Sequence, residues 1–365
     1  MLNLDSCKRR QKRLLEQMQN RRLDWVLLAN PKTIYYFSGV LVDAALPQAF
    51  ALHSSGRSLL VTNQEPKQSA VNRIYVYTAY TLQHPFNRTT MLEELVRYLR
   101  QGVVKGVVAW EEEHVPAVVS RNFETPAENI TPVIAEMRRI KDEDELEAIR
   151  QTIRLTEAGY AAVHGWMAPG LTEYEVYARF QEAVISHAQT SVDLRGDFAC
   201  GTRAIHGGGP PTMRRLAPGD LYILDIFPFY NGYHCDLCRT FAVEKPSSVQ
   251  KEAWQMVFEA HKLVQRLIRP GEEATRIYHV ICTLLDSFQP AAGSFHHHLG
   301  HGVGMDGWEY PWLIPGSEQL IQQGEVLAIE PGLYGENLHG GVRLERNYLV
   351  EKDGITPLDE YPLEL

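Results

Sequence analysis

Three absences limit what this sequence can encode. No apolar run in the 365 residues approaches the roughly 20 residues that a membrane-spanning helix needs, so no such helix is expected. The first residues form a basic run without the apolar core of a signal peptide. Positive charge is not in excess, and a net charge of −9 argues against binding to nucleic acid or to an anionic membrane surface. We therefore expect a cytoplasmic protein that binds neither nucleic acid nor a membrane.

Cysteine is also sparse. The five cysteines are odd in number and scattered, so a disulfide framework is not expected. Cys235 and Cys238 form a C-x-x-C pair, which can indicate zinc or redox chemistry. No second pair exists, and Asp236 stands between the two on a strand-like segment. We interpret these cysteines as small residues that flank a ligand.

The length of the chain predicts two domains. The basic N-terminal run predicts the polar face of an opening helix, with Leu14, Leu15 and Met18 facing inward. Residues 1–133 then alternate strand-like and helix-like patterns, with strands predicted at 24–29, 49–53, 58–62, 75–80 and 106–110 and a helix at 91–100. A charged helix start follows a proline-containing stretch at 130–145. This places the boundary between a supporting domain, 1–133, and a second domain, 134–365.

The second domain contains a short internal repeat. One helical pattern ends at Pro169-Gly170 and another at Pro270-Gly271, and an amphipathic helix follows each. Capping boxes are predicted at Thr172 with Glu175 and at Ser247 with Gln250. Each half then supplies strands that bear two carboxylates. The repeat predicts two helix–helix–hairpin units related by a pseudo-two-fold axis, with the acids meeting between them.

Four carboxylates and one histidine interrupt apolar, strand-like runs in this domain. Burying a carboxylate costs several kcal/mol unless it is paired or bound to a metal. Four carboxylates carry more charge than one divalent ion neutralises, which predicts two ions that share the site. Oxygen ligands with one imidazole suit Mn²⁺, Fe²⁺, Co²⁺ or Zn²⁺. The predicted ligands are Asp225, Asp236, His301, Glu330 and Glu345.

Local sequence explains how these residues could converge. Asp225 and Asp236 are eleven positions apart, an offset that would point them to opposite faces of one straight strand. Asn231-Gly232 between them is a strong turn signal, and a hairpin would place both acids on neighbouring strands. Arg343 lies two residues before Glu345, on the same strand face, and could hold a ligand carboxylate.

This set of residues predicts hydrolysis. Two divalent ions that share a water lower its pKa toward neutrality and polarise a substrate carbonyl. Glu330 could then pass a proton to the leaving nitrogen. His206 and His297 are candidates to steady the substrate carbonyl or the oxyanion.

The five residues, their order and their local motifs resemble the pita-bread metallopeptidases, which include methionine aminopeptidase, Xaa-Pro aminopeptidase, prolidase and creatinase. The Y-Y-F-S-G stretch (35–39) resembles part of the creatinase/prolidase-type N-terminal domain, and residues 138–150 resemble the family's linker. The resemblance implies a mixed α/β (α+β) fold. Residues 1–133 would form a creatinase-like N-terminal domain, and residues 134–365 a pita-bread catalytic domain whose internal pseudo-two-fold accounts for the repeat.

The resemblance also implies residue roles. The five predicted ligands match the family's dinuclear site, and the catalytic residues would be Glu330, His206 and His297. Substrate-binding positions would be His206, His297, Trp308, Tyr334 and Arg343. Two departures stand out: Trp308 occupies the place of a catalytic histidine, and Arg346 follows Glu345 where an acid is usual. An indole N–H can donate one hydrogen bond but cannot change its charge near neutral pH.

The activity implied is that of a metallo-aminopeptidase or Xaa-Pro dipeptidase, which hydrolyses the N-terminal Xaa-Pro bond of short peptides. Mn²⁺ is the ion expected first, with Co²⁺, Zn²⁺ and Fe²⁺ as alternatives, and a homodimer is implied. Because Trp308 replaces a family histidine, two alternatives remain. One is a metal-dependent hydrolase of a small non-peptide C–N bond, and the other is a non-catalytic peptide-binding relative.

Overall fold

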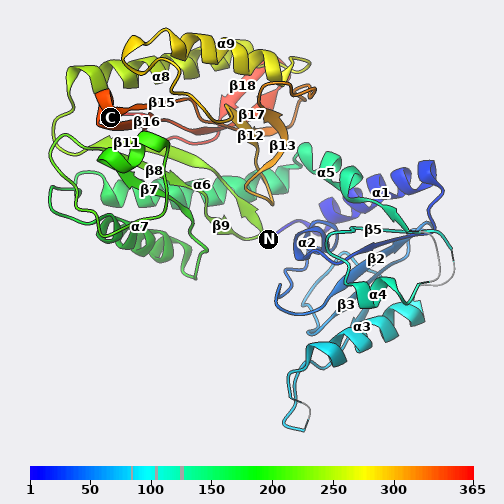
Figure 1. Cartoon of the computed structure of the whole chain (residues 1–365). Coiled ribbons are helices and arrows are strands. Elements are labelled where there is room, and N and C mark those ends of the chain that lie inside the picture. The colour runs from blue at the N-terminus through cyan, green and yellow to red at the C-terminus, as the bar shows by residue number, and fades with distance from the viewer. Residues whose placement is uncertain (84, 103–105, 124–126) are drawn as a thin grey trace. The chain divides into compact units, whose positions relative to one another are not determined.

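The structure is a computed structural model that describes residues 1–83, 85–102, 106–123 and 127–365 (Figure 1). The chain divides into two compact units, Met1–Met137 and Arg138–Leu365. The division falls within helix α5 (Thr131–Arg139), whereas the sequence predicted it between residues 133 and 134. Among the described residues, no helix has both the length and the apolar character to cross a membrane.

The first unit is built on a six-stranded mixed sheet with the order β4-β3-β2-β1-β5-β6. Figure 1 shows α3 and α4 on one face of this sheet and α1 on the other. Tyr77, Met91 and Leu95 belong to the core between α3 and the sheet. The elements are α1 (Leu4–Arg21), β1 (Trp25–Leu28), α2 (Pro31–Ser38), β2 (Ala49–His53), β3 (Ser58–Thr62), β4 (Arg73–Val76), α3 (Arg88–Gly102), β5 (Val108–Trp110), α4 (Ala117–Ser120) and β6 (Ala127–Asn129).

Most predicted elements of this unit are present, with two corrections. The strand predicted at 75–80 is β4, which ends at Val76 because its partner β3 ends opposite it at Thr62. The basic run of α1 is not wholly a polar face. Arg10 is completely buried, with its guanidinium 4.7 Å from the centroid of the Tyr36 ring. A cation can be buried here because the aromatic face and a backbone carbonyl stabilise it.

The second unit contains antiparallel sheets between two helix pairs. The orders are β11-β8-β7 and β13-β12-β14-β17-β18, with β15-β16 and β9-β10 as separate pairs. Its elements are α6 (Glu143–Val163), α7 (Glu173–Ala188), β7 (Gly196–Cys200), η1 (Gly201–His206), β8 (Leu221–Ile226), β9 (Phe229–Tyr230), β10 (Tyr233–His234), β11 (Leu237–Ala242), α8 (Ser248–Leu267), α9 (Ala274–Asp286), η2 (Gln289–Ala291), β12 (Gly300–Gly302), β13 (Glu309–Leu313), β14 (Val326–Ile329), β15 (Gly332–Gly335), η3 (Glu336–Leu338), β16 (Gly340–Arg343), β17 (Arg346–Glu351) and β18 (Gly354–Pro357).

The helices of this unit cover the strands from both sides. Figure 1 shows α8 and α9 on one side and α6 and α7 on the other. On α8, buried residues at helical spacing form the stripe that faces the sheets: Ala253, Val257, Ala260 and Val264. The mixed α/β fold predicted from the sequence is confirmed.

The predicted internal repeat is visible in matching turns. Gly170 and Gly271 adopt φ of 93° and 91°, the left-handed region that glycine allows without strain. The Gly170 N–H donates to the Leu216 carbonyl at 2.8 Å, and the Gly271 N–H donates to the Ile321 carbonyl at 2.8 Å. Both predicted capping boxes are also formed, at the starts of α7 and α8. The turn that follows the first helix is therefore built in the same way in each half.

Candidate metal centre

Asp225 and Asp236 lie on the two arms of a hairpin. Asp225 is part of the buried strand β8, and Asp236 directly precedes β11, which pairs with β8 so that Cys238 lies opposite Asp225. Asn231 and Gly232 form the turn, with φ of 50° and 87°. This pair of left-handed residues is what a type I′ turn requires. The predicted hairpin is confirmed, and it brings the two acids together.

Glycines allow the strand that carries His301 to approach its neighbours. A Cβ atom on Gly300 would lie 2.0 Å from the Ala328 carbonyl oxygen, and one on Gly302 would lie 2.1 Å from that of Tyr310. The His301 ring is completely buried, and its Nδ1 lies 2.9 Å from the Gly302 carbonyl oxygen. A carbonyl only accepts, so Nδ1 carries the proton and Nε2 keeps the lone pair that a metal ligand needs.

Backbone hydrogen bonds fix the two glutamates. Glu330 follows β14, and its N–H donates to the Leu299 carbonyl at 2.8 Å. Glu345 lies between β16 and β17, and its N–H donates to the Cys238 carbonyl at 2.9 Å, which attaches it to β11. Both side chains are buried, with exposed fractions of 6% for Glu330 and 1% for Glu345. Both carboxylates are therefore largely shielded from bulk water.

The structure brings all five predicted ligands into one cluster. The Nε2 atom of His301 lies 3.7 Å from Asp236 Oδ2 and 3.5 Å from Glu330 Oε1. Potential ligand atoms of Asp236, His301 and Glu345 lie within 4.8 Å of one another, as do those of Asp225, Glu330 and Glu345. Glu345 belongs to both groups, so the five residues form one continuous cluster.

The carboxylate oxygens and the imidazole nitrogen of this cluster are suitable ligands for divalent cations. Five buried atoms of this cluster make no hydrogen bond to any residue that the structure describes: Oδ1 of Asp225, Oδ1 of Asp236, Nε2 of His301 and both carboxylate oxygens of Glu345. A buried polar atom without a partner costs about 1–3 kcal/mol, and more when it is charged. All of these atoms can donate an electron pair, so cations would satisfy them together.

Crowding of negative charge appears in the pKa values. Burial, together with the nearby negative charge of Asp197 and Glu330, outweighs Arg343 and raises the pKa of Asp225 to about 6. Burial and neighbouring carboxylates also raise the pKa values of Asp236 and Glu345 well above their ordinary range. Glu330 differs. Burial pushes its pKa up, but the nearby imidazoles of His298 and His301 outweigh burial and hold its pKa low.

Arg343 is the cation at the edge of this cluster. Its Nη2 lies 2.6 Å from Asp225 Oδ2 and donates a hydrogen bond of 2.7 Å to Asp197 Oδ2. Asp197 lies on β7 in register with Asp225 on β8, so the two acids flank the guanidinium. The expected contact of Arg343 with a predicted ligand carboxylate is therefore present.

A pocket of about 340 Å³ opens beside the cluster. It is lined by Asp225, Asp236 and Glu330 and by four of the predicted substrate-side residues: His206, His297, Trp308 and Arg343. Tyr334, the fifth, is buried and contacts His297 instead. The predicted site residues thus share one site.

His297 is already bonded through both ring nitrogens. Its Nδ1 lies 2.7 Å from the His298 carbonyl oxygen, and its Nε2 lies 2.7 Å from the Tyr334 hydroxyl. The carbonyl must accept, so Nδ1 is protonated and the Tyr334 hydroxyl donates to Nε2. Burial lowers the pKa of His297 to about 4, despite the opposing charge of Glu330. Nε2 of neutral His297 is therefore an acceptor, so His297 can donate to a substrate oxygen only if Tyr334 moves away and Nε2 gains a proton.

Trp308 stands at the mouth of the pocket on a loop held by ion pairs. It is 61% exposed, and its ring centroid lies 6.2 Å from that of Phe227. The side chain of the next residue, Glu309, is only 8% exposed and pairs with Arg138 and with Lys141, whose Nζ lies 3.0 Å from Oε2. These cations outweigh burial and lower the pKa of Glu309 to about 2. The aromatic side chain is thus presented by a fixed loop.

The sequence assigned no role to Asp197 and His298, which also line the pocket. Asp197 occupies a strand otherwise free of charge (196–200), a signal that could have indicated a buried acid near the site. His298 belongs to the run of three histidines at 296–298, of which the sequence predicted only His297 as a site residue. Its Nδ1 lies 3.1 Å from Glu330 Oε1.

Comparison with known proteins identifies the family to which this sequence belongs. Residues 147–352 match the model of metallopeptidase family M24, and residues 10–140 match the creatinase/prolidase N-terminal domain. Fold and site thus describe a two-domain metallopeptidase, and the chain belongs to metallopeptidase family M24. It is 26% identical to the Xaa-Pro dipeptidase of Pyrococcus furiosus over 363 residues, covering 98% of this chain and 99% of that protein.

Solved structures show the same fold. The prolidase from Pyrococcus horikoshii OT3 aligns with a TM-score of 0.84 at 24% identity, covering 98% of this chain and 99% of that one. The X-Pro aminopeptidase from Thermotoga maritima aligns with a TM-score of 0.82 at 22% identity, covering 97% and 98% of the two chains. The predicted creatinase-like domain and pita-bread fold are confirmed.

Proposed function

We propose that this chain hydrolyses the N-terminal Xaa-Pro bond of short peptides with two divalent metal ions. The observation that carries the proposal is the convergence of unpartnered donor atoms beside a pocket of about 340 Å³. Relatives of nearly equal length that are named Xaa-Pro dipeptidases support the substrate class. The proposed metal ligands are Asp225, Asp236, His301, Glu330 and Glu345.

When bound, two such ions supply an activated water and polarise the scissile carbonyl. Glu330, which lines the pocket beside the other ligands, would accept a proton and pass it to the leaving nitrogen. His206 is exposed at the rim, where its ring can donate a hydrogen bond to the substrate carbonyl. Arg343 holds Asp225 in place, and Tyr334 orients His297.

Three finer features belong to the same proposal. Mn²⁺ is the ion we expect, because a site of four carboxylates and one imidazole is rich in hard oxygen donors; Co²⁺, Zn²⁺ and Fe²⁺ have compatible chemistry. A homodimer in the cytoplasm is supported by the family resemblance. Light scattering coupled to size-exclusion chromatography tests the dimer directly.

Hydrolysis by the reconstituted enzyme tests the proposed function. Metal-free protein would be loaded in parallel with Mn²⁺, Co²⁺ or Zn²⁺ and given Xaa-Pro dipeptides and tripeptides with proline second. Matched Xaa-Ala peptides and a Glu330→Gln variant serve as controls. We expect metal-dependent release of the first residue from the proline peptides, absent in the variant. Equal cleavage of Xaa-Ala peptides would contradict proline specificity.

One observation favours a second candidate. The Trp308 ring beside Phe227 forms an exposed aromatic surface at the pocket mouth, which suits a flat or cationic group. A small non-peptide substrate with a C–N bond, such as an amidine or amide, would fit it. Turnover of such compounds by a two-metal enzyme that leaves Xaa-Pro peptides intact would establish this alternative. Metal binding without turnover of either class would indicate a binding protein.

A further inference from the structure

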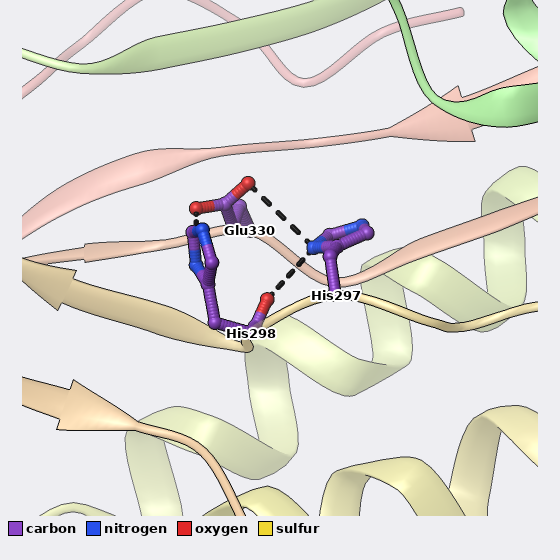
Figure 2. A group of neighbouring side chains, drawn as sticks. All are labelled: His297, His298 and Glu330. Atoms are coloured by element: carbon purple, nitrogen blue, oxygen red, sulfur yellow. Dashed lines mark hydrogen bonds and ion pairs between the residues drawn. The ribbon is translucent and has the colours of Figure 1, made fainter.

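His298 lies beside the proposed metal ligand Glu330. The sequence alone did not predict a function for His298. Its Nδ1 is 3.1 Å from Glu330 Oε1 (Figure 2). The Nε2 of His301 lies 3.5 Å from the same oxygen. One oxygen of Glu330 therefore sits between two imidazoles.

The His298 ring is held from several directions. Its centroid lies 5.3 Å from that of Trp312 with the rings nearly perpendicular, and 5.2 Å from that of His301. Its backbone carbonyl accepts the hydrogen bond from His297 Nδ1 at 2.7 Å. These contacts fix the ring without using its nitrogens. Because Nδ1 is not engaged by the packing, it is available to act on Glu330.

The neighbouring carboxylate is the partner that this nitrogen needs. Nδ1 of His298 is buried and makes no well-aligned hydrogen bond to any residue that the structure describes, although Glu330 Oε1 is close. A buried donor left unsatisfied costs about 1–3 kcal/mol. A proton on Nδ1 directed at Oε1 would relieve this cost and restrict rotation of the carboxylate. Groups that restrain a ligand carboxylate in this way tune metal sites.

The alternative, that His298 itself binds an additional ion with His297 and Glu330, fits less well. Potential ligand atoms of the three residues do lie within 4.8 Å of one another. However, both nitrogens of His297 are already bonded. Arg343 and Asp197 form an ion pair, so two divalent ions already balance the four ligand carboxylates. A third ion would add charge with no carboxylate left to neutralise it.

We infer that His298 is a positioning residue that donates from Nδ1 to Glu330 and orients this carboxylate for one of the two metal ions. The inference rests on the proposed role of Glu330 as a ligand. It assigns His298 a function in metal affinity, distinct from contact with substrate.

Mn²⁺ titration of the metal-free full-length protein tests this inference. We expect His298→Ala to weaken binding of one ion by about 10–100-fold and to leave the other unchanged. His298→Asn places an amide N–H near the position of Nδ1 and should recover most of the affinity. His296→Ala is the matched control for metal affinity, because His296 lines the same pocket but bonds through Nδ1 to the Ser294 carbonyl. Circular dichroism confirms that each variant is folded.

The outcomes separate this inference from the proposed function. Two unchanged affinities in His298→Ala, alongside weakened binding in Glu330→Gln, would overturn the positioning role alone. Three ions in the wild type and two in His298→Ala would overturn it as well, because His298 would then be a ligand. If Glu330→Gln also binds Mn²⁺ as the wild type does, the proposed metal site itself fails.

Discussion

Arg343 and Asp225 form an ion pair, with 2.6 Å between Nη2 and Oδ2, at the edge of a cluster of buried carboxylates. The same nitrogen donates to Asp197, so one guanidinium offsets two acids. This contact neutralises part of the negative charge of the buried carboxylates. Two divalent ions would neutralise more of it. The protein without metal thus depends on Arg343 in a way that the metal-bound protein should not.

The first prediction follows from this dependence. Arg343→Met should lower the stability of the metal-free protein by about 3–5 kcal/mol, because it leaves buried acids without their cation. Saturating Mn²⁺ should raise the melting temperature of the variant more than that of the wild type. Differential scanning calorimetry with and without Mn²⁺ measures both shifts. Equal Mn²⁺-induced shifts in the two proteins would show that Arg343 does not offset this charge.

The ion pairs behind the Trp308 loop give a second prediction. Glu309→Gln leaves Arg138 and Lys141 buried with less negative charge and should destabilise the protein by about 3–5 kcal/mol. Because the pKa of Glu309 is lowered to about 2, its contribution is complete above pH ~4.5 and is lost as the pH falls toward 2. Urea unfolding at several pH values tests this. Glu318→Gln, an exposed substitution nearby, should have little effect.

Trp308 itself should affect substrate and not metal. Trp308→Ala removes the aromatic contact with Phe227, and we expect kcat/KM to fall by about 2–10-fold, equivalent to about 0.5–1.5 kcal/mol. Two bound ions should remain. Trp308→His introduces a group that can change its charge near neutral pH, and it should raise kcat on Xaa-Pro dipeptides. Loss of metal in Trp308→Ala would contradict this division of roles.

A buried histidine away from the pocket predicts a pH dependence of stability. His261 Nε2 donates to the Leu344 carbonyl at 2.9 Å, and burial lowers its pKa to about 3. Between pH ~6.5 and ~3 the unfolded chain binds this proton and the folded protein does not, so stability falls as the pH falls. His261→Gln should remove up to about 1.4 kcal/mol of this loss per pH unit. An unchanged slope relative to the control His187→Gln would contradict the assignment.

The sequence was most informative where local chemistry determines local structure. Asn231-Gly232 predicted the hairpin, and Thr172 and Ser247 predicted two helix starts, because turns and caps depend on a few neighbouring residues. The five predicted ligands could be recognised because each lies in or next to a buried strand, where an unpaired polar side chain is costly. The end of β4 could not be predicted, because it is set by the length of its partner strand.

Contacts between segments that are distant in the sequence could not be predicted from local sequence patterns. Asp197 acts through its register with Asp225 on the neighbouring strand, a pairing that adjacent residues do not encode. His298 looked like one of three similar histidines, and only the folded chain shows which nitrogen faces Glu330. The burial of Arg10 likewise depends on Tyr36, which lies on another helix.

The most direct test of the account is the rate of Xaa-Pro dipeptide hydrolysis as Mn²⁺ is added stepwise to the metal-free protein, with bound metal counted by atomic emission. The account predicts no turnover without metal and a rate that reaches its plateau at two ions per chain. Hydrolysis that persists in the metal-free protein, or its absence with two ions bound, would contradict the central claim.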